Sequence, residues 1–214
     1  VQSNGGLIVA ILSNAVEMID AGAFSASLGA MTHIKTITLS SAAANITFHH
    51  GASSVVLDGT YPIYKFAWSN IHPGEDGRGL CIQANVVGGA DFNETITSTL
   101  FRAFHLENNN TANLAYNTDR DQAQGTAVQH ISFPTGNADD ESTSGEILIF
   151  NPSSTTFVKH FIARSSDVED NSGALDTHTA GYFNTTTAID EFRFSMNSGN
   201  IDAGTIKLYG IKDS

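Results

Sequence analysis

The chain has 214 residues, of which 41% are hydrophobic and only 15% are charged, and its formal net charge at pH 7 is -12. A chain of this length fits a single β-sandwich core. The 22 acidic residues outnumber the 10 basic ones, so the molecule repels phosphate, which argues against direct binding of nucleic acid. Cys81 is the only cysteine, so no intrachain disulfide forms, and its apolar, strand-like surroundings favour an inert core thiol over a nucleophile.

The first element in the chain is an apolar stretch that begins at residues 7–12 and is interrupted by Asn14, Glu17 and Asp20. It lacks the basic flank of a signal peptide, and no run of 18 apolar residues exists, so the sequence predicts no membrane span. We interpret residues 1–31 as an N-terminal arm or attachment segment. A short strand, a helix and an arm laid on a neighbouring subunit all fit this stretch.

Residues 32–214 show short apolar or alternating runs separated by polar, Gly-rich loops at the spacing typical of a sandwich. Tyr64, Phe66 and Trp68 share one face of such a run, which predicts a core-facing aromatic stripe. Residues 189–196 alternate in the same way. The other predicted strands cover residues 33–39, 44–48, 54–57, 80–87, 96–105, 127–133, 146–150, 156–164 and 205–211. The predicted fold is therefore all-β: a jelly-roll-like antiparallel β-sandwich preceded by the N-terminal arm.

Two predicted strands are apolar on both faces. They cover residues 147–150 and 157–162. A strand of this kind needs cover on both sides, so we expect these two at the centre of the sandwich or beneath another subunit.

The residues that could bind metal are scattered. The eight histidines are His33, His49, His50, His72, His105, His130, His160 and His178. His49 and His50 are adjacent, so on a strand they point to opposite faces, which weakens a shared zinc site. The acidic residues of two predicted loops, at 139–141 and at 167–170, are interpreted as solvated charges. A hard cation such as Ca²⁺ is the alternative there, although neither loop has EF-hand spacing, and the sequence leaves metal binding open.

No pattern of catalytic residues is present. The chain has no Gly-x-Ser-x-Gly motif and no phosphate-binding Gly-rich loop with a Lys-Ser/Thr ending. We therefore predict no catalytic or cofactor-binding residues and expect that the protein is not an enzyme. A glycosidase that trims host polysaccharide stays open as a third reading, because its two carboxylates need not be close in sequence.

The C-terminal run at residues 196–211, MNSGNIDAGTIKLYGI, predicts a strand, an Asn/Gly turn and a second strand, with Ile206 and Leu208 facing opposite to Lys207 and Tyr209. This run resembles the closing segment of a family of tailed-phage virion proteins that is abundant in marine phages. Further blocks at residues 70–73, 101–105, 151–161 and 180–186 look like that family too, so the resemblance covers residues 35–211. It implies a jelly-roll-like structural or receptor-contacting virion protein without established catalytic residues.

From this resemblance we expect a non-enzymatic virion structural protein, either a capsid decoration or a tail or fibre component. Its expected partners are other copies of itself, arranged around a threefold or other cyclic axis, and other virion proteins. Its expected location is the virion, an extracellular particle made in the host cytoplasm. The alternative is a glycan-binding host-recognition module that contacts host glycans through exposed aromatic side chains and loop Asn and Asp residues. Exposed, coplanar rings of Tyr64 and Trp68 would favour it, and burial of these rings would count against it.

Overall fold

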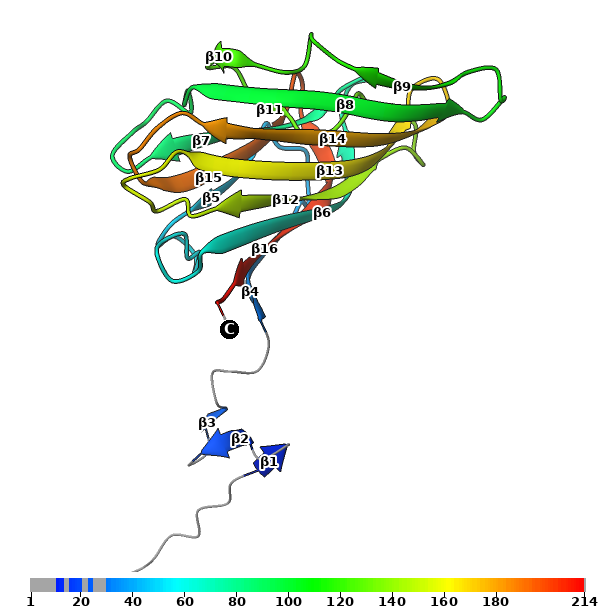
Figure 1. The fold of residues 1–214 in the computed structure, drawn as a ribbon. Helices are drawn as coiled ribbons and strands as arrows, with labels where there is room; N and C mark the ends of the chain where they lie inside the picture. The colour runs from blue at the N-terminus through cyan, green and yellow to red at the C-terminus, as the bar shows by residue number, and fades with distance from the viewer. Residues whose placement is uncertain (1–10, 14–15, 21–22, 25–29, 214) are drawn as a thin grey trace, which may run out of the picture.

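The computed structural model describes residues 11–13, 16–20, 23–24 and 30–213, and strands are the only regular elements in that part of the chain (Figure 1). All paired strands are antiparallel. A nine-stranded sheet and a four-stranded sheet pack face to face, with the smaller sheet behind the larger one in the view of Figure 1. The prediction of an antiparallel β-sandwich is thus confirmed.

The nine-stranded sheet provides one broad outer face. Its order is β10 (Ala123–Gly125), β8 (Ile96–Leu106), β14 (Gly173–Phe183), β13 (Lys159–Glu169), β12 (Thr143–Phe150), β6 (Ile63–Pro73), β16 (Ile201–Ile211) and β4 (Met31–Thr38). A further strand, β9 (Ala112–Tyr116), pairs with β8. β12 and β13 lie in the middle of this sheet, but β13 is covered on one face only, because Ile162 on its outer face is 54% exposed. Phe157 of the second run precedes β13 and is 71% exposed.

The second sheet is smaller and closes the other side of the core. Its order is β11 (Gln129–His130), β7 (Leu80–Val86), β15 (Ile189–Met196) and β5 (Ile46–His49). A separate three-stranded sheet consists of β1 (Ile11–Ser13), β2 (Val16–Asp20) and β3 (Ala23–Phe24). Much of the predicted N-terminal arm, including most of its first apolar run, lies outside the described residues.

Aromatic rings fill the space between the two sheets. The ring of Phe66 on β6 lies 5.2 Å from Phe48, 5.5 Å from Phe192 and 5.1 Å from Phe194, measured between ring centroids. Tyr64 and Trp68 are buried on the same face of β6. Edge-to-face packing of this kind suits the charge distribution of aromatic rings. The sequence-predicted stripe is therefore confirmed as the centre of the core.

Several sequence predictions about strands are wrong, and the short strands β9 and β10 were not predicted at all. Residues 54–57 form no strand, because Val55 and Leu57 reach the core from a loop in which the Leu57 N–H donates to Nδ1 of His50. Within residues 127–133 only β11 pairs as a strand. The eleven-residue strand β14 is missing from the prediction, because inward-facing threonines conceal its alternation of polar and apolar positions.

Asp167 corrects the interpretation of residues 167–170 as a solvated loop. It lies in β13, is only 2% exposed and accepts hydrogen bonds from Thr143, Ser165, Thr177 and the Phe133 N–H. Burial raises the pKa of this carboxyl to about 6, although its hydrogen bonds act in the opposite direction. The carboxylate is therefore part of the core and is not a surface ligand for calcium.

Candidate functional site

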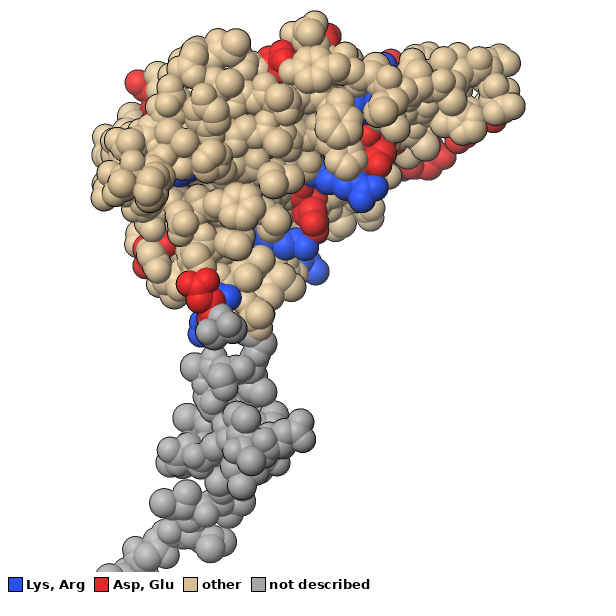
Figure 2. Space-filling view, in the orientation of Figure 1, with Lys and Arg blue, Asp and Glu red and all other residues tan. Residues whose placement is uncertain are grey.

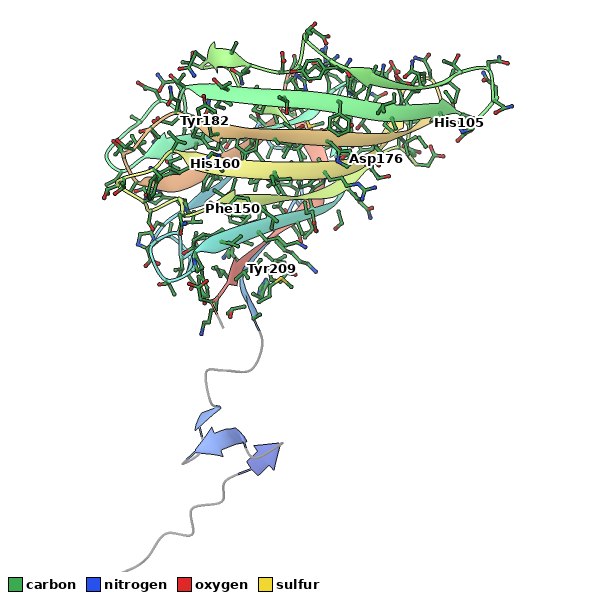
Figure 3. The ribbon with its side chains drawn as sticks, viewed as in Figure 1. His105, Phe150, His160, Asp176, Tyr182 and Tyr209 are labelled. Atoms are coloured by element: carbon green, nitrogen blue, oxygen red, sulfur yellow. The ribbon has the colours of Figure 1, made fainter. Side chains whose placement is uncertain are left out.

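The outer face of the nine-stranded sheet is the face that points away from the four-stranded sheet (Figure 1). Alternate residues of β8, β14, β13, β12 and β6 point away from the core, so cross-strand partners form rows across the sheet. In one such row Tyr182 is paired with His160 and Phe150 is paired with Ile63. Tyr182, His160 and Phe150 lie toward the same end of the strands in Figure 3. This end of the face is mainly aromatic and apolar.

Opposite charges alternate across the middle of the face. We use the name charge ladder for five side chains there: Lys65, Glu146, Arg164, Asp176 and His178. Nζ of Lys65 lies 2.5 Å from Oε2 of Glu146 on the next strand. On β13, Nε and Nη2 of Arg164 donate to the two carboxylate oxygens of Asp176 at 2.8 and 2.9 Å. Nε2 of His178 lies 3.2 Å from Oδ1 of Asp176. Figure 2 shows basic and acidic side chains adjoining one another on this face.

The Asp176 carboxylate contacts two other groups of the ladder, Arg164 and His178. The hydrogen bond from Arg164 is the main reason that its pKa lies below the usual range, and His178 acts in the same direction. Two parallel N–H···O bonds also fix the plane of the guanidinium. Asp176 is therefore ionised at neutral pH and holds Arg164 in one orientation.

A shallow depression of about 420 Å³ lies over the ladder. Side chains of Ser144, Glu146, Arg164, Ser166 and Asp176 line it, and Gly145 and Ser165 complete it. These residues come from the three adjacent strands β12, β13 and β14. The lining thus mixes hydroxyl, carboxylate and guanidinium groups over a few ångströms.

Gly145 lets β12 and β13 approach closely beneath the depression. A Cβ atom at this position would lie 2.4 Å from the Arg164 carbonyl oxygen and 2.6 Å from Cζ2 of Trp68. We expect Gly145→Ala to lower the free energy of unfolding by about 1–3 kcal/mol, since neither backbone nor a buried indole yields easily. Urea unfolding measures this change. Gly59→Ala is the matched comparison, because Gly59, like Gly145, has no positive φ and the only atom near its Cβ position is Oγ of Ser153 at 3.8 Å. A loss at Gly145 no larger than at Gly59 would contradict the steric argument.

Apolar side chains gather beside the ladder at the β8–β9 hairpin. Phe101 pairs with Tyr116 across these strands, and Ala103 pairs with Leu114. Leu114 is 72% exposed, Tyr116 51% and Phe101 42%. We call Phe101, Leu114 and Tyr116 the hairpin patch. The ring of Phe101 also stacks on that of His178 at 4.9 Å, so the hairpin patch is continuous with the charge ladder.

The cysteine and the histidines considered as candidates from the sequence lie in different parts of the fold. Cys81 is fully buried, and burial raises its thiol pKa, which agrees with an inert core residue. His33, His105, His160 and His178 lie on strands of the nine-stranded sheet, whereas His130 lies on β11 of the other sheet. His49 lies 3.7 Å from Glu191, and His50 accepts the Leu57 N–H.

Metal-binding groups do not converge in the described part of the chain. No set of three or more His, Cys, Asp or Glu side chains there is placed to hold an ion. The acidic residues at 139–141 line a second depression, of about 480 Å³, together with Asn70 and His72. The Nε2 atom of His72 is hydrogen-bonded to the carbonyl oxygen of Ala138, so this ring helps to hold the loop.

Sequence reasoning missed Glu146, Arg164 and Asp176 as members of one site. They are 12 to 30 residues apart in the chain, and each is an ordinary outward-facing residue of its own strand. Only the strand order brings them together. Arg164 and Asp176 lie on the two strands of one hairpin, β13–β14, which turns at residues 170–172, so this pair was missed because β14 was not predicted as a strand.

Comparison with protein-family models, with curated proteins and with solved structures finds no match for this chain. Across the described residues, no helix of the length and apolar character needed to cross a membrane is found.

Proposed function

We propose that this protein is a non-enzymatic structural component of a phage virion, a capsid decoration or a tail or fibre part, which self-associates and docks on other virion proteins. The resemblance of its C-terminal run to virion proteins supports the virion assignment. The free edge of β9 is the observation that carries self-association. The proposal places the protein in the assembled particle, where neighbouring copies cover surface that one copy leaves exposed.

β9 is an edge strand without the usual protection. In the described part of the chain it pairs only with β8, so its other edge has no strand partner. Its sequence, Ala-Asn-Leu-Ala-Tyr, contains no charged residue and no proline. The opposite edge strand, β4, carries Lys35 and His33, which discourage pairing with another chain. An unprotected edge flanked by the hairpin patch favours pairing with a second copy.

A charge on β9 should weaken self-association. We expect Leu114→Lys to shift the protein toward the 22.7 kDa mass of one chain, because the lysine must lose water when two β9 edges approach. Size-exclusion chromatography with light scattering at micromolar concentration and near-physiological salt measures the mass. Val87→Lys is the matched control, since Val87 is 57% exposed but lies beyond the end of β7, away from the hairpin.

Two outcomes would count against the proposal. A wild-type protein that stays a monodisperse monomer at micromolar concentration contradicts self-association, and equal masses for wild type and Leu114→Lys oligomers contradict the β9 edge. Imaging of the virion with labelled protein tests the assignment to the particle. A particle that lacks the protein contradicts it.

The burial of Tyr64 and Trp68 argues against glycan binding through the aromatic stripe of β6. Tyr64 is fully buried and Trp68 is 3% exposed, and both side chains face the core. The hydroxyl of Tyr64 donates to the Asp58 carbonyl, and Nε1 of Trp68 donates to Thr143. These two rings stabilise the sandwich and are unavailable to a ligand.

A further inference from the structure

The geometry points to a binding site for a neutral oligosaccharide in the depression over the charge ladder. None of the residues that line this depression belongs to β9 or to the hairpin patch, although Phe101 borders both surfaces. Its lining offers donors and acceptors side by side: the guanidinium of Arg164, the carboxylates of Glu146 and Asp176, and the hydroxyls of Ser144 and Ser166. Neighbouring strands are about 4.8 Å apart, close to the width of one sugar ring, so successive strands can meet successive hydroxyl groups.

The polar groups of the depression are already ordered. Arg164 is 65% exposed, yet both Nε and Nη2 are bonded to Asp176, which in turn contacts His178. A ligand that binds here therefore orders few additional side chains, which reduces the entropic cost of binding. Charged partners also make stronger hydrogen bonds to hydroxyl groups than neutral partners do.

The balance of charges selects a neutral ligand. Lys65 and Arg164 contribute two positive charges, and Glu146 and Asp176 contribute two negative charges, so these four formal charges sum to zero. The whole chain carries -12, which repels an anionic polymer at long range. A phosphate, a sulfated sugar or a uronate would thus find no excess of positive charge here.

The ladder is also poorly suited to a flat protein partner. The centre of a protein–protein interface is depleted in charged residues, and covering ion pairs with protein removes their water at a cost. Sugar hydroxyls replace that water with hydrogen bonds. Apolar side chains flank the ladder, because Ile162 is 54% exposed on β13 and Phe101 is 42% exposed beside His178. Such side chains suit the C–H faces of a sugar ring.

Nuclear magnetic resonance titration of the full chain tests the site. The probes are neutral oligosaccharides of glucose, mannose, galactose and N-acetylglucosamine, each at up to about 10 mM so that dissociation constants near 1 mM are detected, with polygalacturonate as the anionic arm. We expect at least one neutral probe to shift resonances of residues that line the depression. Arg164→Gln and Asp176→Asn should each weaken binding about tenfold or more, the effect of losing a charge-assisted hydrogen bond.

Lys207→Gln is the matched control, because Lys207 is an exposed cation on β16 of the same sheet and does not line the depression. It should bind the probe as wild type does. The inference is overturned if no neutral probe shifts these resonances, if polygalacturonate binds more tightly than the neutral probes, or if Arg164→Gln binds as wild type does. A fall in oligomer mass for Arg164→Gln without any sugar binding would instead identify the face as a protein interface. Because Leu114→Lys leaves the depression intact, failure of this site and failure of the β9 edge are distinguishable.

Discussion

Phe66→Ala is expected to lower the free energy of unfolding by about 3–5 kcal/mol, since it removes a fully buried ring and leaves a cavity that its neighbours fill only in part. Phe66 lies where the two sheets meet: it is paired with Ile147 on β12 and with Leu208 on β16, and its ring contacts Phe48 from the opposite sheet. For a chain of this size such a loss lowers Tm by on the order of 10 °C. Scanning calorimetry or urea unfolding measures the change.

The comparison for Phe66 is a phenylalanine that the fold does not bury. Phe157 is 71% exposed, so Phe157→Ala should change the free energy of unfolding by less than about 0.5 kcal/mol. If Phe66→Ala fails to fold, Phe66→Leu keeps most of the volume and should fall between the two. All proteins are measured at one concentration, because self-association also adds to apparent stability. Equal losses at Phe66 and Phe157 would contradict the assignment of the core.

The second large effect concerns the dependence of stability on pH, in which a buried carboxyl, Asp167, and a partly buried imidazole, His130, act in opposite directions. The pKa of Asp167 is raised from 3.8 to about 6 by burial, so the folded state binds the proton more tightly than the unfolded state. Its contribution to stability is complete below pH 3.8 and is lost as the pH rises through 6. A difference of about two pKa units corresponds to about 3 kcal/mol.

His130 has the opposite sign in almost the same range. Burial, helped by the nearby charge of Arg120, lowers the pKa of this imidazole from 6.5 to about 4. The unfolded state therefore binds the proton more tightly, and the contribution of His130 is present above pH 6.5 and lost as the pH falls through 4. Its size is also about 3 kcal/mol. In the wild-type protein the two contributions largely cancel.

Single substitutions should reveal each contribution. Asp167→Asn keeps an oxygen for the three donors at Oδ2, which are Ser165, Thr177 and the Phe133 N–H, and it removes the titration. When the pH falls from 6.5 to 4, we expect the free energy of unfolding of this variant to fall by about 3 kcal/mol relative to wild type. The reason is that the loss of stability at His130 is no longer offset by the gain at Asp167. Over the same fall in pH, the free energy of unfolding of His130→Asn should rise by a similar amount relative to wild type. Urea unfolding across this range measures both slopes, and parallel curves for the three proteins would contradict the assignment. The other carboxylates are the same in wild type, Asp167→Asn and His130→Asn, so their contributions to the pH dependence cancel when the three proteins are compared.

The outer face and the β9 edge give this protein two surfaces of different chemistry. The β9 edge is apolar and has unpaired backbone, which suits another protein strand. The ladder is charged, balanced and solvated, which suits a polyhydroxyl ligand. A virion component that binds its neighbours through one surface and a host glycan through the other combines both proposals. Leu114→Lys tests the first surface and Arg164→Gln tests the second.

The sequence by itself determined the all-β class and much of the core. Alternation placed Tyr64, Phe66 and Trp68 on one face, and it did the same for Phe192 and Phe194, because a strand turns successive side chains to opposite sides whatever its neighbours are. The C-terminal strand–turn–strand was predicted correctly for the same reason, and Ile206 and Leu208 are buried while Lys207 is exposed. These features depend only on local geometry and hydrophobicity.

Tertiary structure alone decided the rest. β14 was missed because threonines face the core, and Asp167 was placed at the surface because nothing local shows that its donors come from β12, β14 and the segment after β11. The charge ladder depends on the order of β6, β12, β13 and β14. β13 and β14 form a hairpin around residues 170–172, but β6 and β12 are neighbours although residues 74–142 separate them in the chain. Strand order is set by how the complete set of apolar faces packs together, and no single segment of the sequence contains that information.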